Sequence, residues 1–484
     1  MNILLAAAEI APFAKSGGLA DAVMSLALGL NSLGHKVVCI MPKHGVIDTE
    51  DYKLEPTFLT LNIPMGYHTE YAHLLRYSDH ESGLEVYFVE HDLYFNRNGI
   101  YGDGNEYFDN DKRFIFFSRS IFEACKALDF TPDIIHAHDN HTAFAMPFLS
   151  KVYRLEDRFK STAGVYTIHN LAYQGIYDPY RAMDYSGFGI KEFYDGSYFR
   201  SGDNVNSMKT GIMFADKVTT VSPAYSREIR MHYYAEGLHD ELNSRSSDLV
   251  GILNGVDYAQ WSPKNDKLIP KNYSIDNIEV KNDIKKSFIE NGMFSNPDLP
   301  LVGMVTRLPE QKGIDLVMNK LEGFLQNGSF NFAILGSGAN RFVEFFKYIK
   351  YKFPESTIVE IGYNERIAHR IFAASDYMLI PSRFEPCGLT QMYALSYGTI
   401  PIVRNTGGLS DTVFEYQVST REGNGFVFNT YNAEDFANAI NRALSIYNSD
   451  HWHNIRENGM RANHSYRTSA EKYTEVYNWA KEKL

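Results

Sequence analysis

The N-terminal stretch NILLAAAEIAPFAKSGGLADAVMSLALGLNSL, residues 2–33, carries the pattern on which the fold depends. Residues 2–8 form an apolar run of strand length, a turn with two glycines follows, and residues 18–33 place apolar side chains at helical spacing. A buried strand followed at once by a helix is the building unit of parallel α/β sheets. We expect a first strand here and not a signal peptide, because no basic start precedes the run and Glu9 and Pro12 soon follow it.

Strand-like runs and helical patterns alternate along nearly the whole chain. In the first part we expect further strands at 36–41, 84–89, 133–137 and 163–168, and helices at 113–128 and 141–152. The alternation restarts near residue 299, with strands expected at 301–305, 332–335, 357–361, 377–381 and 400–403 and helices at 314–325, 341–352, 366–374 and 388–397. Strands that are apolar on both faces indicate a parallel sheet covered by helices on both sides. The sequence therefore predicts an α/β protein with two doubly wound, Rossmann-like domains.

Composition narrows the class of protein. A length of 484 residues suits two large domains, and 44% hydrophobic with 22% charged residues excludes a disordered chain, a collagen-like fibre and a coiled coil. The net charge, 47 − 59 = −12, argues against nucleic acid as a partner. No apolar run reaches the roughly 18–20 residues that span a bilayer, so we expect no membrane partner. Three cysteines, Cys39, Cys125 and Cys387, make no disulfide framework and favour a cytoplasmic location.

The first candidate site is the glycine turn AKSGGLAD, residues 14–21. In open α/β sheets ligands bind at the carboxyl ends of strands, and this turn follows one. The amides of a helix that opens on two glycines suit an anion, and Lys15 adds a positive charge. The turn is neither a dinucleotide fingerprint nor a P-loop. On spacing alone, a tight strand–helix turn with a surface lysine stays equally open.

Two histidine-rich motifs follow later strands. HAHDNH, residues 136–141, looks like a metal cluster, but His138 and Asp139 are adjacent where metal hydrolases need a gap, and no partner motif occurs downstream. We expect no metal there, and polar groups at a strand end instead. His169, in TIHNLAYQG at residues 167–175, could bind a hydroxylated ligand or could be a structural histidine.

The second half of the chain supplies cations and a carboxylate in the same kind of position. Arg307 and Lys312 follow a strand and precede a helix, where a diphosphate would sit, although two solvated surface cations are the alternative. The motif SRFEPCGLTQ, residues 382–391, follows another strand and places Glu385 where it could accept hydrogen bonds from sugar hydroxyls. A further glycine turn, RNTGGL, occupies residues 404–409. Together these motifs predict a site for a nucleotide-diphosphate sugar.

The same motifs carry a resemblance to a known family. KSGGLAD (15–21), HAHD (136–139), IHNLAYQG (168–175), GILNGVD (251–257), Arg307 with QKG (311–313) and PSRFEPCGLTQ (381–391) occur in this order. The chain resembles the bacterial glycogen synthases, which are similar to the plant starch synthases. The resemblance implies a GT-B glycosyltransferase fold, with two Rossmann-like domains facing an interdomain cleft. The implied domains are 1–258 on the glucan acceptor side, 259–462 on the nucleotide-sugar donor side, and a C-terminal helix, 463–484, that crosses back to the first domain.

The resemblance also implies the reaction: transfer of glucose from ADP-glucose to the non-reducing 4-hydroxyl of an α-1,4-glucan such as glycogen, with retained configuration and without metal or cofactor. It implies roles in catalysis for Glu385, His169, Arg307, Lys312 and Asp139. Arg307 and Lys312 would neutralise the diphosphate, Glu385 and His169 would hold glucosyl hydroxyls, and Asp139 would lie close to the reacting sugar or acceptor. It implies substrate binding by Lys15, Gly17, Gly18, Asp21, Asn254, Tyr363, Cys387, Gly388, Leu389 and Thr390, with Tyr363 beside the adenine.

Departures from the family pattern and rival functions remain at this point. Many retaining GT-B enzymes carry a second Glu where this chain has Tyr393, and its absence leaves ribose recognition unassigned. The sequence also offers no clear second carboxylate as a nucleophile, which favours front-face attack within an ion pair. Ser16 and Ala22 stand where Thr and Val are usual, and Ser396 and Asn405 at positions that are often basic. One rival is another nucleotide-sugar enzyme of the same fold. The other is a non-catalytic glucan-binding scaffold.

Overall fold

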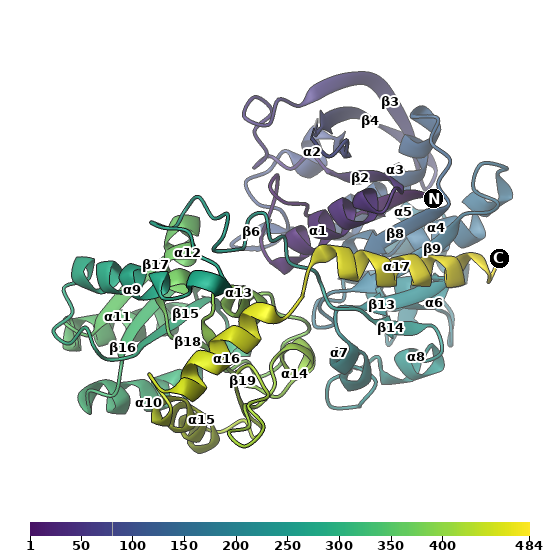
Figure 1. Ribbon diagram of the computed structural model, residues 1–484. Coiled ribbons are helices and arrows are strands. Elements are labelled where there is room, and N and C mark those ends of the chain that lie inside the picture. Colours follow the sequence, from purple (N-terminus) through teal and green to yellow (C-terminus); the bar gives the residue numbers. More distant parts are fainter. Residues whose placement is uncertain (80) are drawn as a thin grey trace. The chain divides into compact units, whose positions relative to one another are not determined.

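Two units, each with a sheet of its own, make up the chain (Figure 1). The computed structural model describes residues 1–79 and 81–484. Unit 1 contains Met1–Gly255 and Tyr466–Leu484, and unit 2 contains Val256–Ser465. The limits expected from the sequence, after residues 258 and 462, each lie three residues from these junctions. None of the helices in the described part of the chain is both long and apolar enough to cross a membrane.

The sheet of unit 1 has the strand order β14-β13-β9-β8-β1-β2-β5-β4-β3. Its parallel part contains β1 (Asn2–Ala6), β2 (Lys36–Pro42), β5 (Glu85–Glu90), β8 (Ile134–His138), β9 (Ala163–Ile168), β13 (Lys217–Thr220) and β14 (Leu249–Gly251). At one edge β3 (Glu55–Met65) and β4 (His68–Ser78) add an antiparallel hairpin. The sequence analysis predicted the five central strands and missed this hairpin, since its strands alternate between exposed and covered residues and do not form apolar runs.

Helices of unit 1 cover the sheet, and the last helix of the chain is among them. They are α1 (Gly18–Ser32), α2 (Asp92–Phe95), α3 (Asn110–Ala127), α4 (Ala145–Lys151), α5 (Pro179–Ser186), α6 (Ser207–Phe214), α7 (Pro223–Glu228), α8 (His239–Ser244) and α17 (Tyr466–Lys481). Helices α1 and α17 lie side by side and share one apolar cluster with β1, β2 and β8 (Figure 1). Ala470, Tyr473 and Tyr477 of α17 are buried in that cluster.

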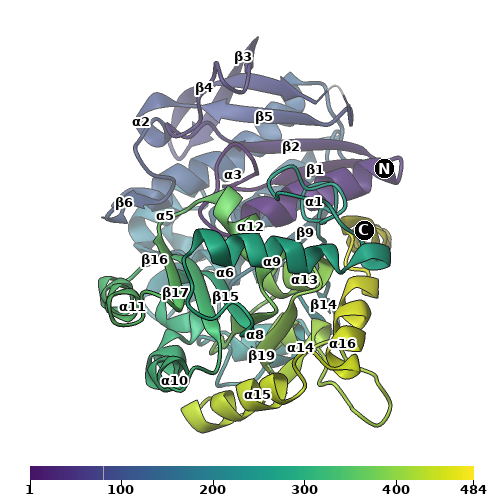
Figure 2. The same ribbon diagram turned by 60° about the vertical axis from the view of Figure 1, so that its left-hand side comes forward.

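The sheet of unit 2 is parallel throughout, with the order β17-β16-β15-β18-β19-β20. The strands are β15 (Leu301–Leu308), β16 (Asn331–Gly338), β17 (Thr357–Ile361), β18 (Tyr377–Ile380), β19 (Ile400–Arg404) and β20 (Phe426–Phe428). One apolar cluster packs α10 (Ile314–Gln326), α11 (Asn340–Lys352), α15 (Ala433–Ser445) and α16 (Asp450–Arg461) on the sheet. A second cluster packs α9 (Val280–Asn291), α12 (Glu365–Ala374) and α13 (Thr390–Ser396) on it (Figure 2). The predicted doubly wound arrangement is confirmed.

Each sheet has one place where the strand order reverses. In unit 1 the chain runs from β1 to β2, adds the β3–β4 hairpin and β5 on the same side of β1, and then returns to β8 on the other side of β1. In unit 2 it runs from β15 to β16 and β17, and then returns to β18. The connections leave a doubly wound sheet on opposite faces at such a point, so a crevice opens beyond the carboxyl ends of the two central strands. The turn with Lys15 and residue Asp139 follow β1 and β8, while Lys312 and Glu385 follow β15 and β18.

Candidate functional site

In unit 1 the glycine turn after β1 is organised by a residue that the sequence analysis did not single out. Glu9 is buried, and its carboxylate accepts hydrogen bonds from the Ser16 amide, from the Ser16 hydroxyl at 2.6 Å and from the Gly17 amide at 3.3 Å. The Tyr101 hydroxyl donates to the same carboxylate at 2.5 Å. The anion-receptive amides of this turn therefore already have an anion, which belongs to the chain. The only sequence signal for this role was an acidic residue directly behind an apolar strand.

Two predicted binding residues of the same turn form an ion pair. The Lys15 ammonium lies 2.7 Å from the Asp21 carboxylate, and both side chains are partly exposed. Asp21 lies in the first turn of α1, where the helix dipole favours a carboxylate. The pair holds Lys15 against the start of α1, at the carboxyl end of β1.

Asp139 directly follows β8 in a strained conformation. Its backbone has φ 58° and ψ 179°, a region that side chains other than glycine rarely adopt. Its carboxylate accepts a hydrogen bond from the His169 amide at 2.8 Å. Burial raises the pKa of Asp139 to about 7, with a further contribution from the nearby charge of Glu9, although backbone hydrogen bonds oppose the shift. Residues with strained backbone conformations cluster at functional sites, and the strain at Asp139 therefore supports a functional role for its side chain.

Two histidines at the carboxyl ends of neighbouring strands, His138 of β8 and His169 after β9, are in direct contact. His138 Nδ1 lies 3.0 Å from His169 Nε2, and burial lowers the pKa of His169 to about 3, so the ring is neutral. His136 bonds to Tyr477 through Nδ1 at 2.8 Å and to Thr167 through Nε2 at 2.5 Å. Within residues 1–79 and 81–484, His, Cys, Asp and Glu side chains form no group of three that could hold a metal ion.

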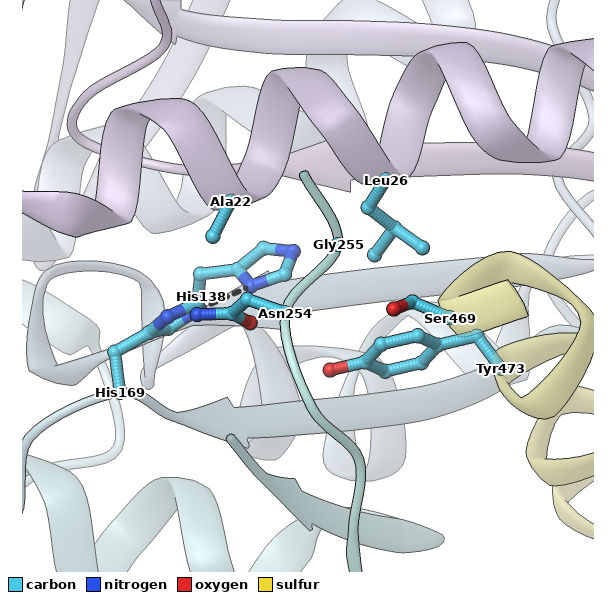
Figure 3. Close-up of a pocket in the computed structure, with 8 residues that line it drawn as sticks. All are labelled: Ala22, Leu26, His138, His169, Asn254, Gly255, Ser469 and Tyr473. Atoms are coloured by element: carbon cyan, nitrogen blue, oxygen red, sulfur yellow. Dashed lines mark hydrogen bonds between the residues drawn. The ribbon is translucent and has the colours of Figure 1, made fainter. Parts of the chain in front are cut away.

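The side chains of His138, His169 and Asn254 line one small chamber in unit 1. Figure 3 shows His169 and Asn254, both predicted site residues, beside His138. His169 follows β9, and Asn254 lies just beyond β14. The ends of β9 and β14 thus bring two predicted ligand groups together, beside His138 of the HAHDNH motif, for which the sequence predicted polar groups at a strand end.

In unit 2 the predicted cation and carboxylate are in direct contact. The Lys312 ammonium lies 2.5 Å from the Glu385 carboxylate, and the Ser382 hydroxyl donates to the same carboxylate oxygen at 2.9 Å. Glu385 is buried, whereas Arg307 is exposed at the end of β15. A buried carboxylate with a fixed geometry and an ammonium beside it suit a sugar hydroxyl and an adjacent phosphate.

Backbone contacts at glycines hold the loop that carries Glu385. A Cβ atom at Gly313, in the turn after Lys312, would lie 2.0 Å from the Pro381 carbonyl oxygen. The Gly408 amide donates to the Glu385 carbonyl at 3.0 Å, and a Cβ atom there would lie 2.1 Å from the Cys387 carbonyl oxygen. The second glycine turn, residues 404–409, thus supports the Glu385 loop through packing.

The remaining predicted residues of unit 2 also follow the carboxyl ends of strands in its sheet. Gly388, with φ 72°, Leu389 and Thr390 lead into α13 and are half-buried. Because Cys387 is buried, its thiol is not presented to solvent. Its carbonyl oxygen accepts a hydrogen bond from the Gln391 side chain at 3.0 Å. Tyr363 follows β17 and is 76% exposed.

Both parts of the chain match known families. Residues 2–244 match the family model described as the starch synthase catalytic domain, and residues 285–461 match that of glycosyl transferases group 1. The glycogen synthase of Clostridium novyi (strain NT) is 40% identical over 480 residues, which are 99% of this chain and 98% of that protein. The glycogen synthase of Bacillus subtilis (strain 168) is 40% identical over 481 residues, again 99% of this chain and 98% of that protein.

Solved structures show the same likeness. The catalytic domain of starch synthase IV from Arabidopsis thaliana, bound to ADP and acarbose, has a TM-score of 0.91 and 34% sequence identity, and 99% of each chain is covered. The sucrose-phosphate synthase from Thermosynechococcus elongatus has a TM-score of 0.60 at 15% identity over 99% of this chain and 98% of that one, a likeness of fold alone.

Proposed function

This chain belongs to the family of glycogen and starch synthases and is a glycosyltransferase, and we propose that it transfers glucose from ADP-glucose to the non-reducing 4-hydroxyl of an α-1,4-glucan such as glycogen, with retention of configuration. The observation that carries the proposal is the Lys312–Glu385 pair, 2.5 Å apart, at the point where the strand order of unit 2 reverses. The starch synthase with TM-score 0.91 binds ADP, which supports this donor nucleotide. Three buried free thiols, Cys39, Cys125 and Cys387, support a reducing, cytoplasmic setting.

The donor is assigned to unit 2 on electrostatic grounds. When the glycosidic bond breaks, negative charge builds up on the departing diphosphate, and a catalyst must stabilise it. Arg307 and Lys312 supply two positive charges, and the amides of Gly388, Leu389 and Thr390 add dipoles at the start of α13. In this proposal these groups do the work that carboxylate-bound Mg²⁺ does in many other transferases. Tyr363 borders the adenine.

The acceptor is assigned to unit 1, where neutral His169 holds a glucosyl hydroxyl, Asn254 assists, and Asp139 lies near the reacting sugar or the acceptor. In unit 2, the Glu385 carboxylate holds glucosyl hydroxyls of the donor. Lys15, Asp21 and Gly18 complete the phosphate and reacting-centre region, whereas the Gly17 amide, also predicted to face the phosphate, already donates to Glu9.

Retention is proposed to occur by front-face attack. The sequence offers no clear second carboxylate as the nucleophile of a double displacement, so we assign the departing ADP oxygen as the base that takes the acceptor proton. Tyr393, at the position of the second Glu of many enzymes of this fold, stacks on Trp261 with ring centroids 3.9 Å apart, and ribose recognition stays unassigned.

The first experiment measures incorporation of labelled glucose into glycogen from ADP-glucose, with EDTA present and UDP-glucose in parallel. We expect transfer from ADP-glucose despite the chelator. Turnover with UDP-glucose alone would overturn the donor assignment, and glucan binding without transfer from either donor would favour a scaffold.

Two variants test the role of the cations in that assay. Arg307→Ala should lower kcat by roughly 10²–10³ because it removes charge that stabilises the transition state. Arg461→Ala is the matched control, since it removes one charge from unit 2 in a surface ion pair with Glu457 that contributes little to stability. Equal activity of the two variants would contradict the proposed role of Arg307.

A further inference from the structure

A small chamber in unit 1 adjoins the histidine pair. Its volume is about 10 Å³, close to what one water molecule requires. The side chains and backbone around it come from α1, from the ends of β8, β9 and β14, and from α17: Ala22, Leu26, His138, His169, Asn254, Gly255, Ser469 and Tyr473 (Figure 3). The last helix of the chain therefore reaches the same chamber as a predicted catalytic histidine.

One polar atom of the chamber lacks a partner. His138 is fully buried, and its Nδ1 is 3.0 Å from His169 Nε2. Its other nitrogen, Nε2, has no hydrogen-bond partner in residues 1–79 and 81–484. In Figure 3 this nitrogen points away from His169, toward the space beside Gly255. Buried polar atoms in proteins are nearly always satisfied, by ordered water where protein groups do not reach.

The polar lining suits a single water molecule. The Ser469 hydroxyl donates to the Leu253 carbonyl at 2.6 Å, which leaves its oxygen as an acceptor. The Tyr473 hydroxyl points toward Asn254 and His138 (Figure 3). A water in the chamber can accept from Tyr473 and donate to both Ser469 Oγ and His138 Nε2. Three partners are the usual number for a buried water.

The protonation of the two rings links this water to the site. Burial lowers the pKa of His138 and of His169, so both imidazoles are neutral and share one N–H between them. A water that donates to His138 Nε2 leaves the proton of His138 on Nδ1, from which it is donated to His169 Nε2. The proton of His169 then resides on its own Nδ1, the nitrogen left for a ligand.

We propose that the chamber binds one water molecule, through which Tyr473 and His138 fix His169 as a hydrogen-bond donor toward the glucosyl group. Tyr473 and His138 are then positioning residues, and the helix α17 contributes to catalysis from behind the reacting groups. The inference rests on the proposed function, in which His169 holds a glucosyl hydroxyl.

Two tyrosines of α17 provide a matched test. Tyr473→Phe removes the hydroxyl at the chamber, and Tyr477→Phe removes the hydroxyl that bonds His136 Nδ1 at 2.8 Å. Both rings are buried in the same cluster, so packing is retained in both variants. We expect Tyr473→Phe to lower kcat about tenfold with the KM for ADP-glucose within about twofold, and Tyr477→Phe to change kcat less than about twofold. Equal kcat values for the two variants would overturn the proposal.

Substitution of His138 separates positioning from packing. The amide of His138→Asn can occupy the place of Nδ1 and still donate to His169, whereas His138→Leu cannot. We expect Asn to restore most of the kcat that Leu loses, and equal loss in both would count against the proposal. The ¹⁵N spectrum of histidine-labelled wild type gives an independent reading, in which His169 protonated on Nε2 overturns the assignment. This spectrum requires no substrate, so a wild type that transfers no glucose would refute the proposed function alone.

Discussion

At the scale of single residues, Asp139 has two features that lower the stability of the folded protein and that a purely structural residue would not retain. Its φ of 58° with ψ near 180° is strained, and burial raises the pKa of its carboxyl to about 7. The carboxyl nonetheless accepts the His169 amide at 2.8 Å and so lies beside a second predicted site residue. Strain and burial at one carboxylate are typical of sites where stability is given up for function.

Asp139→Asn tests this cost through its pH dependence. A folded pKa of about 7 exceeds the ordinary value of 3.8, so the stability that Asp139 contributes is present below about pH 4 and lost as the pH rises through 7. Asn does not titrate, and its oxygen can keep the bond from His169. We measure the difference in Tm between Asp139→Asn and wild type at two pH values. We expect this difference to be roughly 1–4 °C more positive at pH 8 than at pH 5. Transfer of glucose by the variant should be largely lost.

Asp133→Asn is the control for this measurement. Burial raises the pKa of Asp133, but hydrogen bonds from Lys481 and the Asn2 amide outweigh burial, so its pKa is lowered and it stays charged from pH 5 to 8. Its Tm difference from wild type should therefore be the same at both pH values. An unchanged difference for Asp139→Asn as well would contradict the shifted pKa.

At the scale of elements, the order of strands and helices could be predicted because the apolar runs of a parallel sheet are continuous. The strands of unit 2 are the clear case: residues 301–305 and 332–335 were predicted, and β15 and β16 contain them. The β3–β4 hairpin was missed because its exposed face interrupts the apolar pattern. In the site, the motifs located Lys312 and Glu385, but their contact depends on how two loops pack. The role of Glu9 depends on a fold-back of seven residues that no local pattern specifies.

The loop that carries Glu385 yields a prediction at this scale. A methyl group at Gly408 would lie 2.1 Å from the Cys387 carbonyl oxygen, so Gly408→Ala must displace the backbone next to Glu385. We expect a loss of about 1–3 kcal/mol of stability and at least a tenfold lower kcat, measured by denaturant unfolding and by the transfer assay. Gly323→Ala, in α10 with no atom within 4 Å of the added methyl, should instead stabilise the protein by about 1 kcal/mol without changing kcat. Similar effects of the two substitutions would contradict the supporting role of the second glycine turn.

At the scale of the whole molecule, the chain leaves unit 1 at Gly255 and returns to it at Tyr466, so the first unit is completed only by the last helix. Gly29 of α1 and Ala470 of α17 are in close contact, since a Cβ atom at Gly29 would lie 2.8 Å from that of Ala470. The Tyr477 hydroxyl of α17 forms a 2.8 Å hydrogen bond with His136 in the central strand β8. The apolar core of unit 1 is thus assembled from both ends of the sequence, whereas that of unit 2 is continuous in sequence.

Removal of residues 466–484 should therefore destabilise one unit and spare the other. The deletion exposes the apolar cluster around Ile3, Leu5 and Val23, which α17 covers. Hydrogen exchange is expected to rise by at least about tenfold in β1, β2 and β8 and to stay near the wild-type rate in β15 and β16. Removal of residues 482–484 alone, which are exposed, is the control and should change neither set. If exchange rose equally in both sheets, the two units would unfold together, and the division of the chain at Gly255 and Tyr466 would not describe its cooperative units.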